Sequence, residues 1–400
     1  MQRKLDLRTG KPVWAAYRAP SVPFHSLRRD LKTDVLVIGM GISGAMAAEA
    51  LTAAGCRLVM IDRRGPVRGS TAASTSLVQY EIDQPLTMLA KRIGRDRAGR
   101  AWRRARLAVA NLNARISELG IPCDLALRPS LYLQGDVLGA EALEIEAEAR
   151  QAAGLAAAFL SRGRVLEEYG VDRAAIRSHD NLAVDLRKLT AGLLRKALQR
   201  GARAFAPVEA TALVHHAGVV EVATAAGPVI RADRVVLATG YELIDVVPAA
   251  KHRIISTWAI ATGPQPRKLW PDRAMMWEAS DPYLYLRATS DGRIVCGGED
   301  EDFADEEARD ALIEEKAASI ADKLGALRPG IDSRPQFAWT GSFGTTTTGL
   351  PYVGALPRRP RIFAVMGYGG NGIAYSQIAS EMVRAWATGN EAPDADLFAF

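Results

Sequence analysis

The sequence predicts an α/β fold in which a parallel sheet is combined with a mixed-sheet α+β region. Residues 34–62 have the pattern of strand, glycine turn, helix and strand, and residues 362–387 repeat a strand, a glycine turn and a helix. Residues 254–334 alternate apolar and polar side chains, as antiparallel strands do. With 400 residues, 48% of them hydrophobic, the chain is long enough for two domains or one large discontinuous domain.

The first glycine motif is GMGISG, at residues 39–44. An apolar strand precedes it at 35–38, an alanine-rich helix follows it at 45–54, and a second strand at 58–61 ends in Asp62. Glycines at this spacing allow a tight turn, close approach to a pyrophosphate, and close packing of the helix on its strand. The helix N-terminus adds N–H groups and the positive end of its dipole. The motif therefore predicts a Rossmann-like dinucleotide site, with Asp62 as acceptor for ribose hydroxyls.

Charge, cysteine and histidine usage and hydropathy argue against a nucleic-acid-binding, metal-binding or membrane protein. The 51 basic and 45 acidic residues give a net charge of only +6, and the densest basic cluster, 92–106, has the spacing of a solvated helix face. Nucleic-acid binding is therefore not expected. Three separated cysteines without a CxxC motif, and five histidines without ligand spacing, predict no metal site. We expect a cytoplasmic protein without membrane insertion, because no apolar run reaches 18 residues and the first thirty residues lack a signal-peptide centre.

The predicted domains are interleaved along the chain. Residues 1–33 contain Pro12, Pro20 and Pro23 and are expected to form an N-terminal arm. The expected pieces of the nucleotide-binding domain are residues 34–85, 181–253 and 336–400. The expected pieces of the second domain are 86–180, which contributes helices and a strand, and 254–335.

The expected elements follow from periodicity and from helix-stop signals. Helices are expected at 86–119, 140–160 and 186–199, and strands at 130–134, 204–208, 211–215, 219–223, 229–230 and 235–237. The last strand enters ATGY, 238–241, whose small residues permit close backbone approach to a ligand. The glycine- and hydroxyl-rich segment 65–76 is expected either to supply donors to a cofactor or to cap the next helix.

Two further segments bear on the site. In YLYLR, the side chains of Tyr283, Tyr285 and Arg287 share one strand face, where they line a pocket or form a cross-strand ladder. Residues 340–354 are too rich in glycine and threonine for core and are expected to form a loop. The strand at 362–366 then runs into GYGGNG and a helix at 373–387. A helix N-terminus there suits a flavin, because the reduced ring carries negative charge near N1 and the C2 carbonyl.

The ordered set of motifs resembles the FAD-dependent oxidoreductases of the D-amino acid oxidase, glycine oxidase and sarcosine oxidase superfamily. The resemblance covers residues 30–390 and is carried by GMGISG with Asp62, GSTAAST, ATG, GLPYVG and GYGGNGI. The stretches RGPVRGSTAASTSLVQYEID and LYLRATSDGRIVCGGEDEDF are similar to amine oxidases of the gamma-glutamylputrescine oxidase type. The resemblance implies a discontinuous Rossmann-like FAD-binding domain and a mixed-sheet α+β substrate domain that roofs the flavin.

The resemblance also implies the site. The residues expected around FAD are Gly39, Gly41, Ile42, Ser43, Gly44, Asp62, Arg63, Ser70, Thr71, Ser74, Thr75, Val208, Thr239, Gly240, Gly369, Gly370, Asn371, Gly372 and Ile373. Candidates for the substrate pocket are Gln79, Tyr241, Trp258, Tyr285, Arg287, Phe343 and Tyr368. Because GSTAAST contains no histidine and 340–354 no cysteine, a covalent flavin link has no evident attachment point, and FAD is expected to be non-covalent.

The implied activity is oxidation of an amine or amino acid. Hydride passes from the substrate to flavin N5, the imine hydrolyses, and dioxygen or another acceptor reoxidises the flavin, with peroxide released if the acceptor is oxygen. No paired carboxylates or Ser-His-Asp pattern argue for a protein base, so no catalytic side chain is assigned. Three alternatives stay open: a flavin dehydrogenase that reduces a quinone or protein partner, a non-catalytic flavoprotein, and a tRNA-modifying flavin enzyme. The identity and handedness of the amine stay open as well.

Overall fold

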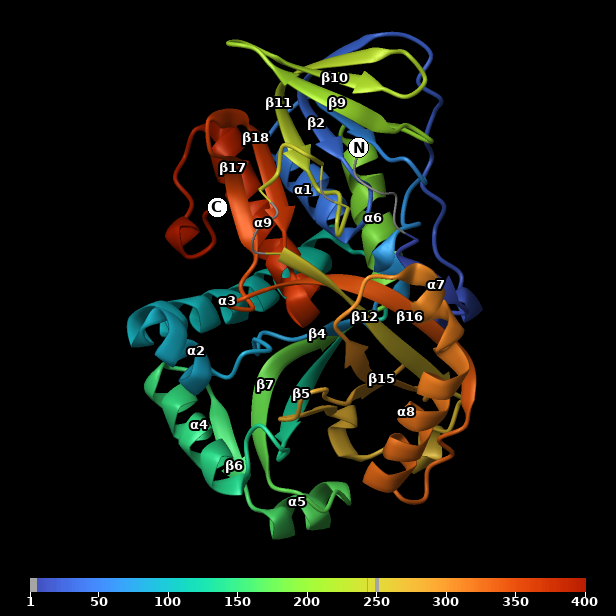
Figure 1. Ribbon diagram of the computed structural model, residues 1–400, viewed down its shortest axis with the longest axis vertical. Helices are drawn as coiled ribbons and strands as arrows, with labels where there is room; N and C mark the ends of the chain where they lie inside the picture. Colours follow the sequence, from blue (N-terminus) through green and yellow to red (C-terminus); the bar gives the residue numbers. More distant parts are fainter. Residues whose placement is uncertain (1–5, 243, 249–251) are drawn as a thin grey trace.

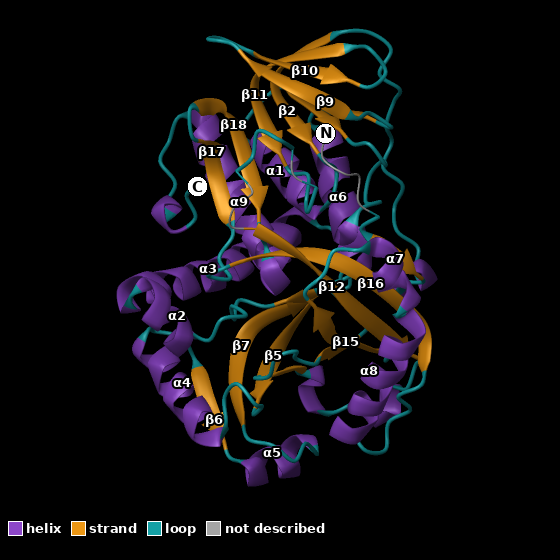
Figure 2. Cartoon of the chain, in the orientation of Figure 1, coloured by secondary structure: helices purple, strands orange, loops and turns teal. Residues whose placement is uncertain are grey.

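The chain folds around two β-sheets that lie toward opposite ends of the molecule, with helices packed against both (Figures 1 and 2). The computed structural model describes residues 6–242, 244–248 and 252–400. The mixed α/β architecture agrees with the predicted fold class. None of the described helices is both long enough and apolar enough to cross a membrane.

The first sheet has a parallel centre, with strand order β18, β11, β2, β3, β8. These strands are β2 (Leu31–Ile38), β3 (Leu58–Ile61), β8 (Arg203–Phe205), β11 (Val229–Leu237) and β18 (Arg359–Met366). The antiparallel additions are β17 (Tyr352–Leu356), β9 (Ala210–His215) and β10 (Val220–Thr224). All four side chains of β3 are buried, because the sheet is covered on both faces.

Three helices cover one face of this sheet, namely α1 (Ile42–Ala53), α6 (Leu186–Gln199) and α9 (Gly372–Thr388). Helix α1 packs against both of the others. Small residues on α1, among them Gly44, Ala45 and Ala48, are buried at these contacts and let the helices approach closely. The start of α1 is thereby fixed beside the start of α9, where the hydroxyls of Ser43 and Ser376 are 2.8 Å apart.

The second sheet is mixed, with strand order β1, β16, β12, β15, β14, β13, β5, β7, β4. Its pairs are antiparallel except for β5 with β13. Its strands are β1 (Arg8–Gly10), β4 (Leu77–Val78), β5 (Ala126–Leu133), β6 (Ala157–Leu160), β7 (Ala175–Ala183), β12 (His252–Thr262), β13 (Met275–Glu278), β14 (Tyr285–Ala288), β15 (Ile294–Glu301) and β16 (Pro335–Thr346). Helix α8 (Ile313–Leu327) buries its apolar side against this sheet.

The remaining helices are α2 (Leu86–Ile93), α3 (Arg95–Leu119), α4 (Ala140–Ala152), α5 (Arg162–Tyr169) and α7 (Glu306–Ala311). The helix expected at 140–160 is wrong at its end, because residues 157–160 form β6 and pair with β7. The two strands expected at 229–230 and 235–237 are one continuous strand, β11, which pairs with β2 along its length.

The prediction of a loop at 340–354 is also wrong in its first half and again at 352–354, which begin β17. Residues 340–346 belong to β16, which pairs with β12 on one edge and β1 on the other. Gly344 is needed within this strand because a neighbour crowds it: a Cβ there would lie 2.0 Å from Nε2 of His252. Tertiary packing therefore places this glycine-rich segment in the sheet against its composition.

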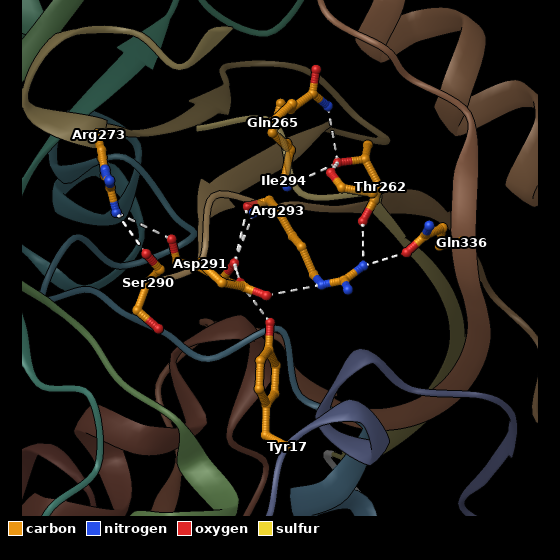
Figure 3. A network of polar contacts seen from close by, with 11 residues as sticks. Tyr17, Thr262, Gln265, Arg273, Ser290, Asp291, Arg293, Ile294 and Gln336 are labelled. Atoms are coloured by element: carbon orange, nitrogen blue, oxygen red, sulfur yellow. Dashed lines mark hydrogen bonds and ion pairs between the residues drawn. The ribbon is translucent and has the colours of Figure 1, made fainter. Parts of the chain in front are cut away.

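The N-terminal arm joins the second sheet through β1, and Trp14 and Tyr17 anchor the segment that follows. The Trp14 ring is buried, and its Nε1 donates to the carbonyl of Ser74 at 2.5 Å. Figure 3 shows Tyr17 donating its hydroxyl to Asp291 at 2.8 Å, while Asp291 also accepts from Nε of Arg293 at 3.1 Å. The arm is therefore bonded to the turn between β14 and β15.

Candidate FAD-binding and substrate site

A cavity of about 340 Å³ lies between the two sheets and is lined by residues of both. It extends from the first glycine motif, past the segment 69–75, to the second glycine motif and the strands β12 to β15. Every predicted FAD residue except Gly44 lines this cavity, and so does every predicted pocket residue except Arg287. One continuous space thus joins segments that extend from Leu7 to Ser376 in the sequence.

The backbone of the first glycine motif forms one end of the cavity. Gly39 has a φ of +112°, and a Cβ there would lie 2.2 Å from the carbonyl oxygen of Ala238. Gly44 stands behind this turn, because its Cβ would lie 1.9 Å from the carbonyl oxygen of Gly39. Gly44 therefore packs the helix onto the turn and does not line the cavity, as the third glycine of such a motif does.

Asp62 organises the loop around this end of the cavity. Its Oδ2 accepts the N–H of Met40 at 2.7 Å, and its Oδ1 accepts those of Arg64 at 2.7 Å and Gly65 at 2.8 Å. The carboxylate thus ties the glycine turn to the end of β3 while still lining the cavity. The N–H of Val208 donates to the carbonyl of Asp62 at 2.9 Å, so only the Val208 carbonyl is available to a ligand from that backbone unit.

The segment after Asp62 is held by its backbone carbonyls. Ala73 accepts from Nε1 of Trp339 at 2.7 Å, Ser74 from Nε1 of Trp14, and Ser76 from Nη1 of Arg287 at 3.1 Å. The Thr71 hydroxyl accepts the N–H of Ile42 at 3.0 Å, at the start of α1. With its carbonyls held by the second sheet and the arm, the segment lines the cavity with the hydroxyl-bearing residues Ser70, Ser74 and Thr75.

The prediction that Arg287 lines the substrate pocket is wrong. Its side chain is 3% exposed, donates to the Ser76 carbonyl, and lies over the Trp14 ring at 5.2 Å. It borders a separate cavity next to Tyr17 and Asp185. Burial lowers the pKa of Arg287 to about 10. The strand alternation put Arg287 on the face of Tyr285 correctly, but the arm and the segment 74–76 cover that face at residue 287.

The second glycine motif is hydrogen-bonded to the segment that follows β4. The N–H of Gly370 donates to Oδ2 of Asp83 at 2.7 Å, and the Asn371 side chain accepts from the N–H of Asp83 at 3.1 Å. A Cβ on Gly370 would lie 2.8 Å from Oδ1 of Asp83 and 2.9 Å from the Tyr283 hydroxyl. The N–H of Gly370 is therefore bonded to a carboxylate of the protein, and a ligand at this loop would meet the other N–H groups.

Several residues that sequence reasoning missed line the same part of the cavity: Asp83, Thr257, Trp277, Tyr283 and Asp300. Tyr283 was considered for its strand face but not included among the candidates. The alternation of Glu81 and Asp83 after a strand was a usable signal for Asp83. Asp300 lies in the acidic run 299–307, whose first residues, 299–301, continue β15.

Burial perturbs the acidic and phenolic groups of this region. Burial raises the pKa of Asp300 to about 7, and the nearby Asp83, Asp281 and Glu299 add to the rise while the Thr257 hydroxyl opposes it. Burial also raises the pKa of Asp83, against the donors Gly370 and Tyr283. Clustered perturbed groups in a cavity are typical of functional sites.

A parallel sheet with a glycine turn at a helix N-terminus, opening on a cavity covered by a second sheet, is typical of dinucleotide-binding proteins. The sequence model of the DAO family, described as FAD dependent oxidoreductase, matches residues 34–386. The chain belongs to this family and is an FAD-dependent oxidoreductase.

Similar proteins agree with this assignment. The chain is 24% identical to gamma-glutamylputrescine oxidoreductase of Escherichia coli K12, over 96% of this chain and 90% of that protein. Its fold is similar to glycine oxidase from Geobacillus kaustophilus, with a TM-score of 0.73 at 19% identity over 91% of this chain and 96% of that one. It is also similar to L-proline dehydrogenase from P. horikoshii, with a TM-score of 0.77 at 18% identity, over 92% of this chain and 97% of that one.

Proposed function

We propose that the protein oxidises the C–N bond of an amine or amino acid to an imine, which then hydrolyses, and that dioxygen takes up the electrons with release of peroxide. The observation that carries the proposal is the single cavity that joins the first glycine motif to an aromatic pocket under the second sheet. A cofactor that spans this cavity has its nucleotide at one end and its reactive ring at the other.

The residues present fit FAD. The turn at Gly39 leaves no room for a side chain, and backbone from Gly39 to Ser43 borders the cavity where a pyrophosphate would bind. Asp62 would hold the adenosine ribose, and Ser70, Ser74 and Thr75 the ribityl chain and ring. The described residues that line the cavity include no histidine or cysteine, which supports non-covalent binding. When bound, FAD supplies the two-electron oxidation in which a hydride leaves the substrate carbon.

The protein's own contribution is to position the substrate and exclude water. The rings of Tyr241 and Tyr368 meet edge to face with centroids 6.0 Å apart, and those of Trp277 and Tyr283 do so at 6.2 Å. Such rings hold a substrate in few orientations, which favours a productive approach of the reacting carbon, and they keep the site dry.

The test is anaerobic mixing of the FAD-loaded protein with a panel of amines and amino acids of both hands. We expect at least one compound to bleach the flavin absorbance, with ammonia or a shorter amine and a carbonyl compound as products. A panel in which no compound reduces the flavin would contradict the proposed activity. Admission of oxygen then tests the acceptor: peroxide in equal amount to product supports dioxygen, and a flavin that stays reduced in air supports a quinone or protein acceptor.

A further inference from the structure

The end of the cavity under the second sheet is acidic and aromatic. Its lining includes Asp83, Asp300, Trp277, Tyr283 and Tyr285, contributed by the segment after β4 and by the region of β13 to β15. The rings of Tyr283 and Tyr285 have centroids 5.5 Å apart. Carboxylates beside aromatic faces bind organic cations, through charge-assisted hydrogen bonds and cation–π contacts.

The two carboxylates are not equivalent. Asp83 accepts the N–H of Gly370 at 2.7 Å, and Tyr283 is a second donor to it, so its hydrogen bonds come from the protein. Oδ1 of Asp300, in contrast, is buried and meets no donor at hydrogen-bonding geometry among the described residues, although the Thr257 hydroxyl lies near enough to lower the pKa of this carboxyl. A buried carboxylate oxygen without a donor is costly, and a ligand that donates to it relieves that cost.

Cationic side chains are found at the other end. Among the described residues that line the cavity, the arginines and lysines are Arg63 and Arg64, which lie next to Asp62 and form ion pairs with Glu242. Arg287 is held by Ser76 and Trp14, away from the cavity. A substrate carboxylate under the second sheet would therefore face Asp83 and Asp300 without a described cation to bind it, which disfavours its entry.

We propose that this end of the cavity binds its substrate as an ammonium cation, held by Asp300 against the rings of Tyr283 and Tyr285, and that the substrate is an amine without a carboxylate on the carbon that carries the nitrogen. One N–H proton of the bound ammonium is lost to solvent before hydride leaves that carbon. The proposal rests on the proposed function and narrows it from amines and amino acids to amines. Asp300 is assigned as the residue that selects the charge of the substrate.

Two compounds that cannot be oxidised test the charge preference directly. tert-Butylamine and 2-aminoisobutyrate both lack hydrogen on the carbon that bears nitrogen, and they differ by a methyl group in place of a carboxylate. Titrated into the FAD-loaded protein and followed by calorimetry, tert-butylamine is expected to bind about tenfold or more tightly than 2-aminoisobutyrate. Equal affinity, or tighter binding of 2-aminoisobutyrate, would overturn the proposal.

The variant Asp300→Asn tests the assigned residue, because it keeps the shape of the side chain and removes its charge. We expect about tenfold weaker binding of tert-butylamine and no loss of FAD. Asp302→Asn is the matched control, because it removes the same charge two positions away. Asp302 is exposed and pairs with Arg253 at 2.6 Å. Equal effects of the two variants, or no effect of Asp300→Asn, would contradict the assignment.

A pH titration of the unmodified protein keeps the test independent of the variant's folding. The amine stays protonated between pH 6 and 8, while Asp300 ionises near 7. The groups that face Asp300 are Asp83, Asp281, Glu299 and the hydroxyls of Thr257, Tyr283 and Tyr285. Burial raises the pKa of both tyrosines, so their phenols stay neutral. Affinity for tert-butylamine should therefore rise from pH 6 to 8. A constant or falling affinity would contradict a role for the ionised carboxylate.

The two proposals fail in different ways. If amino acids reduce the flavin and amines without a carboxylate do not, the oxidase activity stands and the charge preference is wrong. If tert-butylamine binds with the expected preference but no compound of the panel reduces the flavin, the binding inference stands and the proposed oxidation is wrong.

Discussion

The two sheets differ in how their functional residues are distributed along the chain. Around the first sheet, the residues that border the cavity fall in compact segments, such as 39–43 and 69–75. Under the second sheet they are spread over five neighbouring strands, with 257–259 on β12, Trp277 on β13, Tyr285 on β14, Asp300 on β15, and Trp339, Gly341, Ser342 and Phe343 on β16. Under the proposed assignment, nucleotide binding is built by local turns, whereas substrate recognition depends on long-range strand pairing.

The largest effect is expected from a substitution that disrupts the glycine turn of the first sheet. Gly44→Ala places a Cβ 1.9 Å from the carbonyl oxygen of Gly39, so α1 has to move off the glycine turn. We expect a loss of about 1–3 kcal/mol or more in the free energy of unfolding and protein that purifies with little FAD. Thermal denaturation and the flavin absorbance measure both. The control is Gly163→Ala in α5, where the added Cβ meets nothing within 4 Å and stability should rise.

The next effect concerns Asp62. Asp62→Ala removes the acceptor proposed for ribose and leaves the N–H groups of Met40, Arg64 and Gly65 without their carboxylate. FAD affinity should fall about tenfold or more, corresponding to about 1.5–3 kcal/mol, and the apoprotein should also lose stability. Fluorescence of released FAD measures the affinity. Asp34→Ala, which removes an exposed carboxylate paired with Arg57, should change neither, and unchanged FAD affinity in Asp62→Ala would contradict the ribose assignment.

A smaller effect is expected on the pH dependence of stability, which tests the buried carboxyl group of Asp300 under the second sheet. Because the pKa of Asp300 is raised in the folded protein to about 7, ionisation costs stability as pH rises from about 4 through 7. Without substrate, Asp300→Asn should therefore melt at a higher temperature than the unmodified protein at pH 8 and at the same temperature at pH 4. Asp302→Asn serves again as control. Equal melting temperatures at both pH values would show that Asp300 is not perturbed by burial.

The smallest expected effect separates the arm from the cavity. Tyr17→Phe removes the hydrogen bond to Asp291 but keeps the ring beside Trp14. We expect a loss of about 0.5–1.5 kcal/mol in unfolding free energy, with unchanged affinity for FAD and for tert-butylamine. A clear loss of FAD would indicate that the arm supports the cofactor site through Trp14 and the carbonyl of Ser74.

The sequence predicted the fold class, the parallel core and both glycine junctions, because each is encoded within about thirty consecutive residues. It did not predict Asp300, because its place in the cavity depends on the pairing of β15 with β12 and β14. It misplaced Arg287, because strand alternation predicts which face of the strand carries the side chain but not that Trp14 and Ser76 cover this face. It misread 340–346 as a loop, because a glycine that a neighbouring side chain requires, such as Gly344, looks like a turn residue in the sequence.

The central claim is that the first region holds FAD and the second selects the substrate, and one pair of titrations tests it most directly. The dissociation constants of FAD and of tert-butylamine are measured on Asp62→Ala and on Asp300→Asn, with FAD saturating for the amine titrations. We predict that Asp62→Ala weakens FAD binding about tenfold or more with the amine unaffected, and that Asp300→Asn weakens amine binding by a similar factor with FAD unaffected. Variants that each weaken both ligands equally would contradict this division between the two sheets.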